Sequence, residues 1–220
     1  MLSKRKRRKN SAVSLGRSEN IHIGIMGLSE SVGTTTIGLA LASYLSEIKD
    51  YKVAYIDVSS RKSIGYLSRL DNVTKESEDG FSIGKLDFID GKLTEEIYSC
   101  KYDVDLFDYG FEKYPNASNF VNMTIKILVG SMQCFKQDTC IKSLEKILNI
   151  SGSDTWVYII QGEEKEIAKL EKKYEIMVLQ MPYIENSMKQ IKLAHHHTLA
   201  QQVTLFSFLE AWELSNFDKC

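Results

Sequence analysis

The feature that most constrains the fold of this 220-residue chain is a regular alternation of short apolar runs with longer segments of helical periodicity. The apolar runs are rich in β-branched residues and end at Gly or polar residues, which is typical of strands buried on both faces of a parallel sheet. These runs lie at residues 21–26, 52–58, 86–89, 104–108, 126–130, 156–160 and 176–180. Helices are expected at residues 36–48, 61–70, 93–100, 137–148, 163–174 and 198–214.

This alternation predicts the fold class. Strands and helices that follow one another in turn favour an α/β fold of three layers, in which a mainly parallel, doubly wound sheet of about 7 strands carries helices on both faces. One interruption is expected, an acidic and polar loop at residues 71–80. Ligands of such sheets bind beyond the carboxyl ends of the strands, and the first strand-to-helix turn is the usual phosphate site. That turn is therefore the main candidate for function.

Charge is distributed unevenly along the chain, whose formal net charge is only −1. The first 20 residues hold seven of the 28 basic residues but one of the 29 acidic residues. A run of like charges repels itself and has nothing apolar to bury, so residues 1–19 are expected to form a disordered basic arm. With 43% hydrophobic residues and no Gly-, Ser- or Pro-rich linker, residues 20–220 are expected to form a single domain.

The basic arm is the candidate contact for a polyanion. Its run of consecutive basic residues consists of Lys4, Arg5, Lys6, Arg7, Arg8 and Lys9. Near an anionic lipid surface each such residue is worth about 1 kcal/mol, and the same charges could neutralise DNA or RNA phosphates without reading sequence. A purely solubilising tail is nevertheless the first interpretation, and a membrane surface or an acidic protein is the second. Because the rest of the chain is acidic, nucleic acid is the least favoured partner.

The location of the protein is also constrained by the sequence. No run is long and apolar enough to span a bilayer, and no apolar segment follows the basic arm as it would in a secretory signal. We therefore expect a cytoplasmic protein, with peripheral contact at the inner face of the membrane as an option for the arm.

The first strand-to-helix turn, at residues 27–36, reads GLSESVGTTT. It lies between an apolar strand and an amphipathic helix, which is the position of a phosphate-binding P-loop. Such a loop needs small residues so that backbone N–H groups can surround the phosphates. It also needs a Lys that contacts the β- and γ-phosphates and a Ser or Thr hydroxyl that binds Mg²⁺.

At this turn the chain resembles the ParA/MinD family of ATPases with a deviant Walker A motif, and within it the CpaE-like or TadZ-like relatives associated with pilus assembly and polar localisation. The resemblance rests on SVGTTTIGLALASYL at residues 31–45, KVAYID at 52–57, YDVDLFDYG at 102–110 and ILVG at 127–130. It covers most of residues 21–182 and implies a P-loop NTPase-like fold.

The resemblance also implies a set of site residues. Those assigned to the nucleotide are Ser31, Val32, Gly33, Thr34, Thr35, Thr36, Asp57 and Asp108. Of these, Thr35 keeps the hydroxyl that would bind Mg²⁺ directly, and Asp108 keeps the carboxylate that would hold the ion through water. Ser59 replaces the second acidic residue that the family carries after the second strand.

The departures from the family pattern concern charge. The family has a Lys and two Gly before the Val-Gly pair and a second Lys after it, whereas this chain has Ser29, Glu30, Ser31 and Thr34. Each missing Lys removes a charge-assisted hydrogen bond worth about 1.5–3 kcal/mol, and the Glu adds a negative charge where the triphosphate would lie. Efficient hydrolysis is therefore not expected, although the N-terminus of the helix still favours anions.

Three functional hypotheses follow. The first is a non-hydrolysing adaptor or localisation factor with no catalytic residue and no cofactor, which binds partner proteins or a second copy of itself, in a setting of pilus or secretion assembly. The second is an ATPase switched by ATP or ADP with Mg²⁺, in which Lys62 or Lys113 replaces the missing lysines. The third is a DNA-associated partition protein that uses the basic arm.

Two features near the C-terminus have competing interpretations. The three adjacent histidines at residues 195–197 lack a nearby Cys or carboxylate cluster at ligand spacing, so surface or interface histidines are favoured over a metal site. The helix expected at residues 198–214 has a broad apolar surface. That surface favours a helix that packs on the sheet, with a dimer or partner groove as the alternative.

Overall fold

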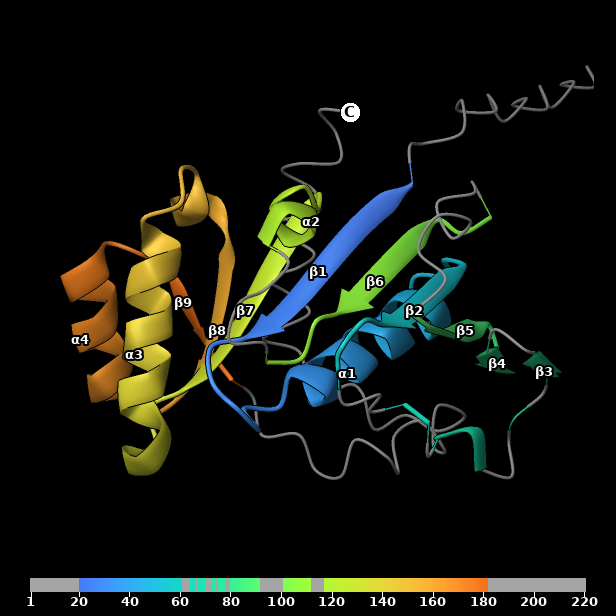
Figure 1. The fold of residues 1–220 in the computed structure, drawn as a ribbon, viewed down its shortest axis with the longest axis horizontal. Coiled ribbons are helices and arrows are strands. Elements are labelled where there is room, and N and C mark those ends of the chain that lie inside the picture. Colours follow the sequence, from blue (N-terminus) through green and yellow to red (C-terminus); the bar gives the residue numbers. More distant parts are fainter. Residues whose placement is uncertain are drawn as a thin grey trace, which may run out of the picture.

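The computed structural model describes residues 20–60, 64–65, 67–69, 73, 75–77, 80–91, 101–111 and 117–181. They form one twisted sheet with helices packed against it (Figure 1). Its strands are β1 (Ile21–Gly27), β2 (Val53–Asp57), β3 (Lys75–Ser77), β4 (Gly80–Ile83), β5 (Leu86–Asp90), β6 (Val104–Asp108), β7 (Ile125–Ser131), β8 (Val157–Gln161) and β9 (Val178–Gln180). The α-helices are α1 (Thr34–Glu47), α2 (Ala117–Val121), α3 (Cys134–Leu148) and α4 (Glu164–Tyr174). Two 3₁₀ turns, Leu67–Arg69 and Ser153–Thr155, complete the described elements.

The strands form one nine-stranded sheet in the order β3-β4-β5-β2-β6-β1-β7-β8-β9. All pairs from β5 to β9 in this order are parallel, and only the β3-β4 and β4-β5 pairs are antiparallel. The mainly parallel, P-loop NTPase-like α/β fold expected from the sequence is therefore confirmed. Because β1 lies between β6 and β7, the turn after β1 and the carboxyl end of β6 meet at one edge of the sheet.

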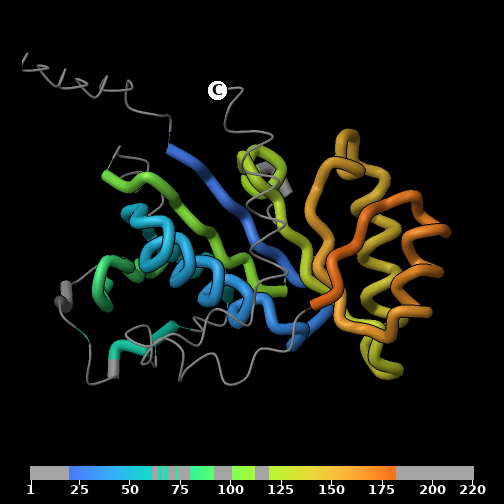
Figure 2. Tube along the Cα trace, turned by 180° about the vertical axis from the view of Figure 1, so that it is seen from behind, coloured from blue at the N-terminus to red at the C-terminus, as the bar shows by residue number. Residues whose placement is uncertain are grey.

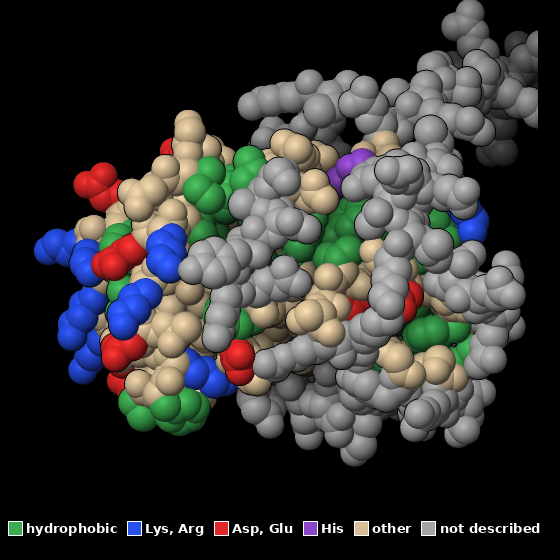
Figure 3. Space-filling view, viewed as in Figure 1, with side chains coloured by type: hydrophobic (Ala, Val, Ile, Leu, Met, Phe, Trp, Pro, Cys, Tyr) green, Lys and Arg blue, Asp and Glu red, His purple; other side chains and the backbone are tan. Residues whose placement is uncertain are grey.

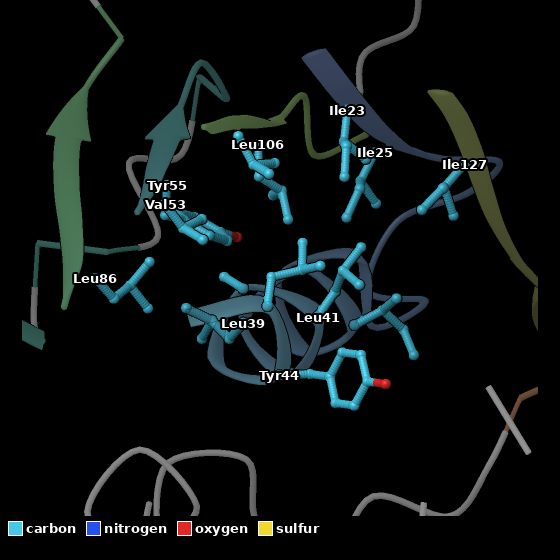
Figure 4. Close-up of a cluster of buried hydrophobic side chains, with 14 of the residues drawn as sticks. Ile23, Ile25, Leu39, Leu41, Tyr44, Val53, Tyr55, Leu86, Leu106 and Ile127 are labelled. Carbon is cyan, nitrogen blue, oxygen red and sulfur yellow. The ribbon is translucent and has the colours of Figure 1, made fainter. Parts of the chain in front are cut away.

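The helices lie on both faces of the sheet. On one face α1 packs over the central strands, and its apolar side joins a cluster that includes Ile25, Tyr55 and Leu106 (Figure 4). On the other face α2, α3 and α4 join a second cluster, which includes Phe120 and Leu144. Figure 2, seen from behind, shows α1 lying along its face of the sheet and α3 and α4 beyond β8 and β9. Among the described residues, no helix is long and apolar enough to cross a membrane.

Local sequence explains most of these elements. The strand β6 has the bounds expected from its apolar run, and the helices α1, α3 and α4 lie where helical periodicity predicts them. The helix α1 begins at Thr34, two residues earlier than expected, because Gly33 adopts a left-handed conformation (φ 91°) and turns the chain into the helix. The short helix α2 was not predicted.

The predictions for residues 61–80 were wrong where the structure describes them. Instead of a helix at 61–70 there is a 3₁₀ turn at Leu67–Arg69, and instead of a loop at 71–80 there is an antiparallel strand, β3, with β4 beginning at Gly80. A Cβ on Gly80 would lie 1.9 Å from the carbonyl oxygen of Phe88, so only glycine permits this close pairing. The rings of Phe81 and Phe88 stack 4.7 Å apart across the β4-β5 pair. Their contact supplies the cross-strand packing that a polar sequence does not suggest.

Several predictions lie outside the described residues. They concern the basic arm at 1–19, the helices expected at 93–100 and 198–214, the histidines at 195–197, and the two candidate lysines, Lys62 and Lys113.

Candidate functional site

The turn between β1 and α1 forms a cleft of about 290 Å³ at the carboxyl edge of the sheet. Its lining residues are Ser31, Val32, Gly33, Thr34, Thr35, Thr36, Ser59, Ser60, Gly110 and Phe111. Six of the eight residues assigned to the nucleotide are therefore brought together, and all six come from the turn and the start of α1. The first backbone N–H groups of α1 face this edge, as they do in a phosphate site.

The backbone of the turn keeps a shape that glycine favours, although this turn has fewer glycines than the motif of the family that it resembles. Gly33 is the N-cap residue of α1. Ser31 also has a positive φ of 53°, at a position where the resembled family has Gly. A non-glycine residue in this region costs about 1–2 kcal/mol, so the surrounding packing must hold the turn in place. The side chain of Val32 supplies part of that packing, because it is buried in the cluster beneath α1.

Thr34 occupies the position of the second family lysine and does not replace its charge. Its side chain is buried, and its hydroxyl lies against Gly27, where a Cβ on that glycine would be only 2.8 Å away. The cleft therefore has a short, inward-lying hydroxyl group where an ammonium group would contact the phosphates.

The two residues assigned to Mg²⁺ bind each other. The Thr35 hydroxyl donates to Oδ2 of Asp108 over 2.7 Å, and the Tyr55 hydroxyl donates to the same oxygen, also over 2.7 Å. The other carboxylate oxygen, Oδ1, accepts from the backbone N–H of Gly110 over 2.8 Å. With a relative exposure of 0%, Asp108 offers no free carboxylate oxygen to solvent.

The electrostatics of this cluster follow from burial. Desolvation raises the pKa of Asp108 above its ordinary value of 3.8, while the hydrogen bonds from Thr35, Tyr55 and Gly110 oppose the rise. Burial, followed by the charge of Asp108, raises the pKa of Tyr55 well above 10. The Tyr55 hydroxyl consequently stays protonated and remains a donor at physiological pH.

Asp57 lies beside Asp108 in the sheet but does not line the cleft, since the two are paired in register across β2 and β6. One oxygen of the Asp57 carboxylate accepts hydrogen bonds from Ser59, from its backbone N–H over 3.0 Å and from its hydroxyl over 2.5 Å. The other oxygen accepts from the backbone N–H of Ile64 over 3.1 Å. In this structure Asp57 therefore anchors the loop that follows β2.

Lys136 is a residue at the turn that sequence reasoning missed. From the first turn of α3 its ammonium group donates to the backbone carbonyl of Ser31 over 2.6 Å, across 105 positions of sequence. The available signal was topological. Because β7 neighbours β1, the helix after β7 begins at the same edge of the sheet as the turn.

These side chains are a poor match to a magnesium-bound triphosphate. Both family lysines are absent and Glu30 adds a carboxylate, although Thr35 keeps its hydroxyl and Asp108 its carboxylate. No group of three or more His, Cys, Asp or Glu residues that could hold a metal occurs in the part of the chain that the structure describes.

Comparison with known proteins places the fold. No family model and no curated protein matches this chain. Among solved structures, a plasmid partition protein from Borrelia burgdorferi B31 bound to AMPPNP is 17% identical, with a TM-score of 0.54 over 87% of this chain and 99% of its own. Apo McdA from Cyanthece is 14% identical, with a TM-score of 0.57 over 83% and 92% of the two chains. A chain of the MinC:MinD cell division protein complex from Aquifex aeolicus is 15% identical, with a TM-score of 0.51 over 78% and 84%. These neighbours are ParA/MinD-type proteins, and at such identities the likeness shows the fold alone.

Proposed function

We propose that this chain is a ParA/MinD-like adaptor or localisation protein that has kept the fold and does not hydrolyse ATP. The observation that carries the proposal is that Thr34, at the position of one family lysine, is buried with its hydroxyl against Gly27 and places no ammonium group in the cleft. Ser29 stands at the other lysine position, and Glu30 adds a carboxylate to the same turn. A triphosphate would therefore lack two charge-assisted hydrogen bonds, each worth about 1.5–3 kcal/mol.

A protein of this kind acts through its surfaces. One structural neighbour was solved in the MinC:MinD complex, and another is a plasmid partition protein, so partner binding and self-association are reasonable for the fold. We propose that the chain binds partner proteins in the cytoplasm and that a homodimer is one of its forms. The basic arm, Lys4 to Lys9, would add a salt-sensitive contact with an anionic membrane, and pilus or secretion assembly is the setting that the sequence resemblance suggests.

Phosphate release by the purified full-length chain tests this proposal. With Mg-ATP in excess, we expect release no faster than in a protein-free blank, because no residue supplies the charge that stabilises the transferred phosphoryl group. The Lys165→Gln variant, which alters an exposed residue of α4, is purified in parallel as a control that should release phosphate at the wild-type rate, while Asp108→Asn reports contaminating ATPases. Magnesium-dependent release by the wild-type chain that Asp108→Asn abolishes would contradict the proposal.

One observation favours the alternative of a nucleotide-switched ATPase. Lys136 places an ammonium group 2.6 Å from the Ser31 carbonyl, so a lysine from α3 is within reach of the turn. Under this alternative, Mg-ATP would bind and Lys136→Gln would weaken that binding by about tenfold or more, since a charge-assisted hydrogen bond is lost. Under the adaptor proposal, neither protein binds.

A further inference from the structure

A second and larger cavity lies beside the turn, on the opposite side from α1. It has a volume of about 660 Å³ and runs between the end of β1, Phe111 and the length of α3. Phe111 also lines the small cleft, so the two cavities are neighbours. A volume of this size falls in the range of pockets that bind ligands or anchor side chains of partners. We name this cavity the α3 groove.

The α3 groove combines apolar surface with basic charge. Three lysines of α3 line it, Lys136, Lys142 and Lys146, and Glu30 on the turn is the only carboxylate among those lining residues that the structure describes. At its mouth Phe135 has 79% of its surface exposed, which is unusual for a large apolar side chain. Figure 3 shows basic side chains, with acidic ones among them, on the α3 and α4 side of the molecule and apolar ones at the end where α3 begins. Exposed large aromatic side chains are typical of interfaces.

A buried polar atom lies in the wall of the groove. Ser29 lines the groove with a relative exposure of only 3%, and its hydroxyl has no hydrogen-bond partner among the described residues. Leaving a buried hydroxyl unsatisfied costs about 1–3 kcal/mol, so a rearrangement on binding that brings a polar atom of the ligand to this hydroxyl would recover part of that energy.

The length of the groove fits a helix. The 15 residues of α3 span roughly 22 Å, and the lining residues extend from its first turn to Ile150, beyond its end. An amphipathic helix of three to four turns would place its apolar face on the groove, with acidic residues opposite the lysines. Charge complementarity thus favours an acidic helix over a basic or neutral one.

We propose that the α3 groove is a docking site for an acidic amphipathic helix of a partner protein, anchored on Phe135 and held by Lys142 and Lys146. This inference rests on the proposed adaptor function and names the kind of partner that the adaptor would take. The groove lies outside the nucleotide cleft, so it can be tested without nucleotide.

The test uses labelled synthetic peptides and the full-length chain, with fluorescence anisotropy as the readout. Four helical peptides of about 15 residues carry Leu and Phe anchors in different positions on one face and Glu beside them, and each has a control peptide in which every Glu is Lys. We expect at least one acidic peptide to bind with a Kd on the order of 10 µM, and its basic control to bind at least about tenfold more weakly.

Variants locate the binding site. Phe135→Ala and Lys142→Glu/Lys146→Glu are each expected to weaken binding about tenfold, because they remove the anchor or reverse the attracting charges. Ser29→Ala is expected to weaken binding about threefold while leaving the melting temperature unchanged or higher, since its hydroxyl has no partner among the described residues of the free protein. The matched control Lys165→Glu/Lys169→Glu reverses two exposed charges on α4 and is expected to change binding by less than about twofold.

Several outcomes would overturn the proposal. These are an absence of binding by all acidic peptides, equal binding by acidic and basic peptides, or no effect of Phe135→Ala. Two others would assign the groove to another occupant: a dimer in sedimentation that Phe135→Ala dissociates indicates a second copy, and flotation with phosphatidylserine vesicles that Phe135→Ala abolishes indicates a membrane. The proposed function fails separately, through ATP turnover, so the two failures are distinguishable.

Discussion

Rebuilding the turn after β1 with the four family residues is expected to create tight Mg-ATP binding. The variant is Ser29→Lys, Glu30→Gly, Ser31→Gly and Thr34→Lys. Two charge-assisted hydrogen bonds of about 1.5–3 kcal/mol each correspond to a gain of about 100-fold or more in affinity, and removing the Glu30 carboxylate adds to it. Titration calorimetry with Mg-ATP measures the gain against the wild-type chain.

The control for this variant separates charge from backbone freedom. Glu30→Gly/Ser31→Gly alone restores the glycines without the lysines, and we expect it to gain less than about tenfold. The variant with all four substitutions is first shown to be folded by its circular dichroism and melting curve. If it still does not bind Mg-ATP, then the absence of the lysines is not the reason why the wild-type turn does not bind nucleotide.

Removing the carboxylate of Asp108 is expected to destabilise the protein by about 2–4 kcal/mol at neutral pH, because it leaves buried donors without an acceptor. Asp108→Ala takes the acceptor from the Tyr55 hydroxyl, which is fully buried, and from the Thr35 hydroxyl and the Gly110 N–H. Urea unfolding at about pH 7 measures the loss. A loss below about 0.5 kcal/mol would show that this cluster does not stabilise the fold.

The isosteric variant Asp108→Asn is the matched control, and its effect depends on pH. It keeps an acceptor for Thr35 and Tyr55 but turns its amide group toward the Gly110 N–H, so we expect a loss of about 1–2 kcal/mol at neutral pH, smaller than that of Asp108→Ala. Burial raises the folded pKa of Asp108 above 3.8, so the folded state binds more protons, and wild-type stability falls as the pH rises from about 4 through that pKa. Asn cannot ionise, and the cost of Asp108→Asn should therefore be larger at about pH 4 than at about pH 7. The opposite trend would contradict a raised pKa.

Local patterns explain how much of the fold the sequence predicts. The strand β6 and the helix α4 follow from an apolar run and from helical periodicity, each within one segment. The strand β4 was missed because its stability depends on Phe88 of β5, the neighbouring strand, and on the close approach that Gly80 allows. Pairing across strands is not visible in a local window of sequence.

Some residues of the candidate site were predicted from the sequence and others were not. Thr35 and Asp108 were expected at one place because the family resemblance assigns both to Mg²⁺, and in the structure they meet because β1 and β6 are paired in the sheet. The contribution of Tyr55 to this cluster was not expected, since an inward-facing tyrosine of β2 is indistinguishable from a core residue in sequence. Lys136 was missed for a different reason: the substitute lysine was sought at Lys62 and Lys113, which lie outside the described residues, and not on the helix that follows β7.

Calorimetric titration of the wild-type chain with Mg-ATP tests the central claim most directly, namely that the turn after β1 no longer binds nucleotide. We predict no saturable heat up to about 1 mM ATP, with the four-residue turn variant as the positive control. Saturable binding of one ATP per chain with a micromolar Kd, lost when Mg²⁺ is chelated, would contradict the account.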